Sequence, residues 1–253
     1  MRAPVAMLLA GLGLLPPLQA QSGKNEPSSF APVLNPAAEG RAIAQRLLRA
    51  VPAESVEFRG QLQIRRRGEP LQILPLVSRL VGGATNWQMT YQIPATAAQP
   101  GERLVVQHVL GDRNVYLHAR GSNTLAVVTG DALAAGLAGS DFALLDLGLE
   151  FLHWPHQHLL KRETRKGRAC QVLESRPAAG AAAGYARVVS WIDAEADGVL
   201  VAEAYDAAGK LVKEFEVDKL TKVDGRWQLK RMEMRSPPRR SLTLIEFDHE
   251  SPP

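Results

Sequence analysis

The sequence predicts a mainly β fold of antiparallel strands with very little helix. Short stretches of alternating apolar and polar residues recur along the 253 residues, and tight-turn signals join them. Only two stretches have helical periodicity. About ten strands spaced about 4.8 Å apart make a sheet roughly 48 Å wide, whereas two helices of about fifteen residues cover strips only about 22 Å long. The sheet must therefore curl on itself or split into two packed layers, and alternation alone leaves both outcomes open.

The stretch 185–247 predicts five consecutive strands that pair as an antiparallel meander. Its turns fall at Asp197-Gly198, 206–209 and Asp224-Gly225, and Pro237-Pro238 breaks the chain before the last strand. Asp-Gly favours a two-residue hairpin because both residues tolerate positive φ. Short strands joined by tight turns indicate that neighbours in the sequence are also neighbours in the sheet.

The amino-terminal half predicts five more strands. One of them contains Pro75, which cannot donate to a neighbouring strand and so indicates a sheet edge or a bulge. Residues 170–174 have the composition of a further strand, which brings the expected total to ten or eleven. The five predicted ranges are 56–65, 71–80, 86–93, 104–110 and 114–118.

A first helix is expected from Pro36 to Pro52, since Ile43 and Leu47 recur at helical spacing and proline ends the run. A second is expected over 139–154, with Ser140 or Asp141 as its N-cap and Pro155 as its end. This second helix is apolar nearly all round, so it must be covered on both sides or lie at a hydrophobic opening.

Residues 1–20 have the pattern of a signal peptide. Arg2 is followed by an apolar run over 6–15 and a small-residue cleavage site at Ala20. Residues 21–36 are expected to form a flexible leader, and 37–253 a single domain. The net charge of +4 permits contact with anionic surfaces but is too small to indicate nucleic-acid binding. Cys170 is the one cysteine, so no intrachain disulfide is expected and a small buried side chain is the simplest interpretation.

Several short motifs carry a family resemblance. The runs Trp191-Ile192-Asp193, 209–213 and 223–227, together with 139–142 followed by Asp146-Leu147, resemble the outer-membrane lipoprotein-sorting proteins and, more closely, the LolA-like periplasmic domains. The resemblance covers roughly residues 40–248. It implies an incomplete antiparallel β-barrel, with an N-terminal helix and a lid-type helical segment, around a hydrophobic cavity suited to acyl chains.

The resemblance also implies a function. We expect a monomeric, non-enzymatic periplasmic carrier without a cofactor, which binds a lipid or an acylated lipoprotein and exchanges it with a donor or acceptor protein of the inner or outer membrane. Burying an acyl chain contributes about 0.8 kcal/mol per methylene, so no catalytic group is needed. The residues expected to line the cavity are Phe58, Leu62, Trp87, Met89, Tyr91, Ile93, Phe142, Leu145, Leu149, Phe151, Trp154 and Trp191.

Two other functions are open. The same fold could serve as a protein-interaction module that senses the state of the envelope. Some regulators of extracytoplasmic sigma factors resemble such a module. A zinc-dependent hydrolase would rest on His153, His156 and His158 alone, and no motif supplies a further ligand, so no metal is expected. Nucleophile elbows, P-loops and dinucleotide-binding motifs are not found in the sequence, and an enzyme is therefore not expected.

Three basic runs, 65–67, 161–168 and 235–240, fall at expected strand ends or turns. They are interpreted either as solvated edges that discourage sheet-to-sheet pairing or as a docking surface for anionic headgroups.

Overall fold

In the part of the chain that the structure describes, thirteen strands form one antiparallel sheet in the order β6-β5-β4-β3-β2-β1-β13-β12-β11-β10-β9-β8-β7. The chain enters the sheet at its middle with β1 and adds neighbouring strands up to one edge at β6. It then crosses to the opposite edge at β7 and adds strands back to the middle, where β13 lies beside β1. β1 pairs with β13, with Leu62 opposite Ile245, and this pairing joins the two halves. The strands are β1 Val56–Arg66, β2 Gln72–Gly82, β3 Asn86–Ile93, β4 Glu102–Val109, β5 Val115–Arg120, β6 Ala126–Val128, β7 His156–Arg165, β8 Arg168–Arg176, β9 Arg187–Asp193, β10 Val199–Tyr205, β11 Leu211–Val223, β12 Arg226–Ser236 and β13 Ser241–Phe247.

The computed structural model describes residues 30–50, 55–83, 86–97, 99–109, 111, 113–179, 184–223 and 226–248. The predicted signal peptide, residues 21–29 of the predicted leader, Pro52 and the Asp224-Gly225 turn lie outside these ranges. Within them, no helix is long and apolar enough to cross a bilayer.

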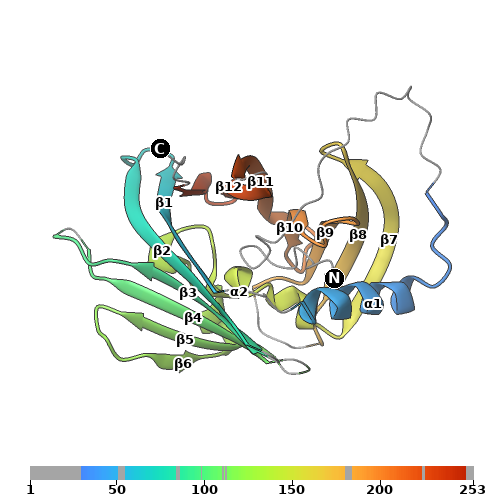
Figure 1. Cartoon of the computed structure of the whole chain (residues 1–253), viewed down its shortest axis with the longest axis horizontal. Coiled ribbons are helices and arrows are strands. Elements are labelled where there is room, and N and C mark those ends of the chain that lie inside the picture. Colours follow the sequence, from blue (N-terminus) through green and yellow to red (C-terminus); the bar gives the residue numbers. More distant parts are fainter. Residues whose placement is uncertain are drawn as a thin grey trace.

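The sheet curls into two arms without closing into a barrel. Figure 1 shows β1–β6 on one side and β7–β10 on the other, with the short helix α2 (Leu144–Leu147) between them. The edge strands β6 and β7 each pair with one neighbour only. The predicted fold class is therefore confirmed, and the alternative of two stacked sheets does not apply.

The meander predicted over 185–247 is confirmed as β9 to β13, but the expected total of ten or eleven strands is wrong. β6 is only three residues long, and β7 is rich in charged residues, so neither has a clear apolar alternation. Pro75 lies in the part of β2 that pairs with β1 alone, because the pairing with β3 begins at Val77. Its missing N–H therefore occurs where β2 is locally an edge strand.

The helix α1 (Pro36–Leu48) agrees with the prediction. The Asn35 side chain accepts a hydrogen bond from the Ala38 N–H at 3.1 Å, and Pro36 occupies the first turn, where its missing N–H costs nothing. Ile43, Ala44 and Leu47 form the buried stripe. At Gly40 an added Cβ would lie 2.6 Å from the backbone of Gln157, so this glycine allows α1 to lie directly on β7.

The continuous helix expected over 139–154 is wrong. The chain instead forms a 3₁₀ turn η2 (Leu137–Gly139), the single turn α2, and a second 3₁₀ turn η3 (Glu150–His153). Leu149 has φ +49, a left-handed conformation that ends α2 and redirects the chain. We call residues 137–154 the cover segment.

Candidate functional site

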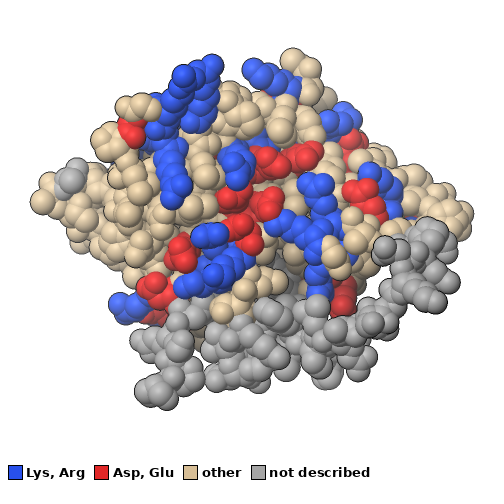
Figure 2. Space-filling view, turned by 90° about the horizontal axis from the view of Figure 1, so that it is seen from above, with Lys and Arg blue, Asp and Glu red and all other residues tan. Residues whose placement is uncertain are grey.

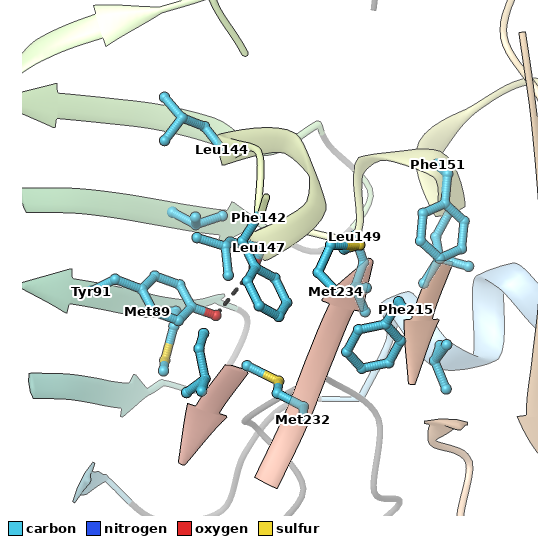
Figure 3. Packing of buried hydrophobic residues seen from close by; sticks show 14 of the residues in the cluster. Met89, Tyr91, Phe142, Leu144, Leu147, Leu149, Phe151, Phe215, Met232 and Met234 are labelled. Carbon is cyan, nitrogen blue, oxygen red and sulfur yellow. Dashed lines mark hydrogen bonds between the residues drawn. The ribbon is translucent and has the colours of Figure 1, made fainter. Parts of the chain in front are cut away.

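The cover segment fills the concave side of the curved sheet. Its apolar side chains pack against apolar residues of the strands, and Figure 3 shows Phe142 and Leu149 close to Met234 and Phe215. The rings of Phe142 and Phe215 meet edge to face, with centroids 6.5 Å apart. The concave face is thus apolar, and what covers it is a short irregular segment rather than a second sheet.

Ten of the twelve residues expected to line a cavity belong to one core cluster, but only Phe142, Leu149 and Phe151 border the small cavity beneath the cover segment. All twelve are buried, and the core cluster contains Phe58, Leu62, Trp87, Met89, Tyr91, Ile93, Phe142, Leu149, Phe151 and Trp154. Leu145 is fully buried on the cover segment. Trp191 lies apart, in a second cluster with Cys170 and Val201. Its neighbours on β9, Val188 and Ile192, belong to the main core, so Trp191 is on the opposite face of the sheet.

The space left between the cover segment and the sheet is small. A cavity of about 30 Å³ remains there, which is room for only a few water molecules. The strand residues that line it were not among the predicted ones, although they alternate along the predicted meander. They are Val188, Val199, Ala202, Ala204, Phe215 and Met234. In this structure the concave face is closed.

A partly buried ion pair attaches the middle of the cover segment to β11. Lys213 Nζ lies 2.8 Å from Asp146 Oδ2, and the two side chains are only 14% and 12% exposed. The Tyr185 hydroxyl donates to Asp146 Oδ1 at 2.9 Å, and the Ala143 N–H donates to Asp146 Oδ2 at 2.8 Å. Burial, followed by the charge of Asp146, raises the pKa of Tyr185 well above its ordinary value, so its hydroxyl stays a donor. Asp146 is therefore the polar centre of this attachment.

A second attachment holds the start of the cover segment against β13. The Ser241 and Thr243 hydroxyls donate to the Asp141 carboxylate at 2.5 and 2.9 Å, and Thr243 Oγ1 accepts from the Asp141 N–H at 2.9 Å. Arg66 Nη2 on β1 donates to the Gly139 carbonyl at 2.5 Å. The prediction of Asp141 as a helix cap is wrong, because its carboxylate binds strand hydroxyls rather than helix N–H groups.

Further polar contacts join the end of the cover segment to β3 and β5. The Tyr91 hydroxyl donates to the Leu147 carbonyl at 3.3 Å (Figure 3), and the Tyr116 hydroxyl donates to Glu150 Oε2 at 2.9 Å. Burial raises the pKa of the Glu150 carboxyl above its ordinary value of 4.5. Burial likewise raises the pKa of Tyr116, and Glu150 adds to the effect. Every part of the cover segment is thus attached through a few specific polar groups.

The three histidines are dispersed over the end of the cover segment and β7. His156 is exposed, whereas the ring of His153 lies near that of His108, tilted by 54° with centroids 5.4 Å apart. In the described ranges there is no group of three or more His, Cys, Asp or Glu side chains placed to hold a metal ion. The site is therefore an apolar surface whose cover segment is attached by polar side chains. Such a surface is suited to binding hydrocarbon.

Solved structures from three bacteria have a similar fold. A DUF1329 family protein from Desulfovibrio piger is 20% identical with a TM-score of 0.70, and the match covers 85% of this chain and 92% of that one. A putative outer membrane lipoprotein-sorting protein domain from Vibrio parahaemolyticus is 16% identical with a TM-score of 0.66, covering 84% and 91%. A LolA superfamily protein from Nitrosomonas europaea is 16% identical with a TM-score of 0.58, covering 85% and 92%.

These likenesses confirm the LolA-like resemblance at the level of the fold. No curated protein matches the sequence. Residues 88–251 match the model of a family described as "Uncharacterized protein", and the chain belongs to that family.

Proposed function

We propose that this protein binds the acyl chains of a lipid or a lipoprotein on the concave face of its sheet, as a carrier without catalytic residues. The observation that carries the proposal is the way this face is covered. An apolar face of a curved sheet lies under a short broken segment that is attached by a few polar contacts. A second sheet or long helices would instead fill such a core permanently.

The closed state has no room for the ligand, so binding requires the cover segment to move. A cavity of about 30 Å³ cannot hold an acyl chain. The ligand must therefore replace the apolar side chains of the cover segment, foremost Phe142, Leu149 and Phe151. A chain of about twelve carbons gains on the order of 10 kcal/mol from burial, which is enough to offset the loss of several contacts of about 1 to 3 kcal/mol each.

The setting we propose is the periplasm. Residues 1–20 have the charge and hydropathy pattern of a signal peptide. The fold shared with a putative lipoprotein-sorting domain supports cargo that carries acyl chains. We further propose that a membrane protein delivers or receives this cargo. The carrier itself is proposed to be a monomer.

An engineered disulfide that holds the cover segment closed tests the proposal. Asp141 and Thr243 are in direct contact, with Oδ2 and Oγ1 2.9 Å apart, so cysteines at both positions would tie the cover segment to β13. The double variant Asp141→Cys/Thr243→Cys is made in a Cys170→Ala background to leave no third thiol. A fatty acid that carries an environment-sensitive dye is titrated into the oxidised and the reduced protein.

We expect an emission gain with the reduced protein and little or none with the oxidised protein. The single variant Asp141→Cys in the same background is the control, and its binding should not depend on the redox state. Equal emission gains in the locked and unlocked states would contradict the proposal, and so would no gain with the folded wild type.

A further inference from the structure

Two basic runs that are far apart in the sequence meet in one hollow. Because β1 pairs with β13, the turn after β1 lies beside the turn between β12 and β13, and Arg67 N–H donates to the Arg240 carbonyl at 3.3 Å. Arg65 and Arg235 both stand opposite Leu242, one from each side. The hollow has a volume of about 470 Å³ and is lined by Arg65, Arg66, Arg67, Arg235, Ser236, Pro237, Arg240, Ser241 and Leu242. We call it the arginine hollow.

The charges of the arginine hollow are largely uncompensated. Arg66 pairs with Glu69 at 3.0 Å and Arg235 with Glu233 at 2.7 Å. Among the residues that the structure describes, no carboxylate lies within ion-pair distance of Arg65, Arg67 or Arg240, and these three residues are exposed. Five arginines and two paired acids leave a local excess of three positive charges.

Elsewhere on the surface, many basic side chains lie beside acidic ones. Over the face that Figure 2 shows, acidic side chains lie among the basic ones. Several basic residues elsewhere on the sheet have acidic partners, such as Arg231 with Asp218 and Lys166 with Glu216. A concentration of unpaired guanidinium groups at one end of the sheet is therefore a specific feature, which the small net charge does not explain.

The chemistry of the arginine hollow fits phosphate. The planar guanidinium group presents paired N–H donors that match two oxygens of a phosphate, and it remains charged at any physiological pH. Between the arginines lie the half-buried Leu242 and the exposed Pro237. Arginines around apolar side chains in an open hollow suit the boundary between headgroups and acyl chains.

The arginine hollow also adjoins the attachment of the cover segment. Arg66, which lines it, donates to the Gly139 carbonyl, and Ser241, which also lines it, donates to Asp141. A phosphate bound there would lie beside the start of the cover segment. Acyl chains leaving a bilayer at this place would have a short path to the concave face.

We propose that the arginine hollow is a docking site for the phosphate headgroups of an anionic membrane surface. It is a separate site from the concave face. The alternative occupant, an acidic protein segment, would use the charge but not the apolar side chains between the arginines.

Sedimentation with vesicles tests this inference. The full chain is mixed with vesicles of phosphatidylethanolamine and phosphatidylglycerol, and separately with vesicles of phosphatidylcholine alone. The triple variant Arg65→Gln/Arg67→Gln/Arg240→Gln removes three cations that have no acidic partner in the described ranges. The matched control, Arg79→Gln/Lys210→Gln/Lys219→Gln, makes the same change of net charge at exposed positions outside the hollow.

We expect wild type to bind the anionic vesicles, the triple variant to lose about 100-fold in affinity at about fivefold per arginine, and the control to lose far less. Equal losses in the two variants would overturn the inference, because they would indicate only diffuse attraction. Absence of wild-type binding, or equal binding to phosphatidylcholine, would overturn it too.

Two further measurements distinguish a membrane surface from other ligands of the arginine hollow. Inorganic phosphate should release the vesicles more than chloride does at the same ionic strength, because it competes for the same guanidinium groups. Binding of inorganic phosphate without any binding to vesicles would assign the hollow to free phosphate and contradict membrane docking. Binding of polyglutamate without any binding to vesicles would assign it to an acidic protein. The dye-labelled fatty acid should bind the triple variant as well as wild type, so failure of membrane docking is distinguishable from failure of the carrier proposal.

Discussion

The helix α1 and the cover segment pack into the same core but are attached in different ways. α1 is a continuous helix of thirteen residues with an N-cap, and its Gly40 lies directly on the backbone of β7. The cover segment consists of three single turns, and Leu149 between them has a left-handed backbone. One element is packed backbone to backbone, whereas the other depends on side chains that can be exchanged.

The two elements differ in whether their contacts must break together or can break one at a time. Moving α1 would expose its buried stripe and break the close contact at Gly40 in one step. The cover segment can be released at the Asp141 attachment and at the Asp146 attachment separately, and hydrocarbon from a ligand can replace its apolar contacts. We therefore regard α1 as part of the scaffold and the cover segment as the movable part.

The largest expected effect is at Gly40. In Gly40→Ala the new Cβ would meet the backbone of Gln157 and His158 at 2.6 Å, and backbone cannot move aside as a flexible side chain can. We expect the free energy of unfolding to fall by about 3 kcal/mol in urea denaturation. Gly68→Ala is the control: it has open space around it, and only its φ of +80 opposes the change. A loss in Gly40→Ala no larger than in the control would show that α1 is not rigidly packed.

An intermediate effect is expected at the Asp146 attachment. Lys213→Met leaves the partly buried Asp146 carboxylate without its cation, so the closed state should be destabilised by about 2 kcal/mol, less than for a fully buried pair. The apparent affinity for the dye-labelled fatty acid should rise up to about 30-fold, because less energy is needed to open the cover segment.

The double variant Asp146→Asn/Lys213→Met removes both charges and should recover most of the stability. Lower affinity in Lys213→Met, with the protein still folded, would mean that the attachment forms part of the ligand site rather than holding it closed.

The smallest effect is expected at Glu150 and depends on pH. Burial raises the pKa of its carboxyl above 4.5, so the folded state favours the protonated form. The contribution of protonated Glu150 to the stability of the folded state is complete below pH 4.5. It is lost as the pH rises through the pKa that Glu150 has in the folded protein. Glu150→Gln should therefore be more stable than wild type at pH 7, by less than about 1 kcal/mol, and the difference should shrink toward pH 4. Thermal unfolding at both pH values measures it, and a difference that grows on acidification would contradict the assigned sign.

The sequence predicted the meander well because alternation and turn chemistry are local signals. β9 to β13 lie where Asp197-Gly198, 206–209 and Pro237-Pro238 indicate their ends. β7 was missed because Lys161, Arg162 and Glu163 obscure its pattern, although Gln157 and Leu159 are buried.

The cover segment could not be predicted in the same way. A stretch that is apolar on all sides has the composition of a helix, but Leu149 and Asp141 follow tertiary contacts instead of propensity. The arginine hollow likewise depends on the β1–β13 pairing, which joins residues more than a hundred positions apart. Most of the predicted lining residues are brought together, and Trp191 is not, because a single register position decides which face a strand residue occupies.

Native-state hydrogen exchange tests the central claim, that the cover segment opens while the scaffold stays folded. We expect the amides of Leu147, Leu149 and Leu152, which donate to backbone carbonyls within the segment, to exchange through an opening several kcal/mol below global unfolding. The amides of α1 and β13 should exchange only with global unfolding. Exchange of the cover segment at the same free energy as α1 would contradict the account.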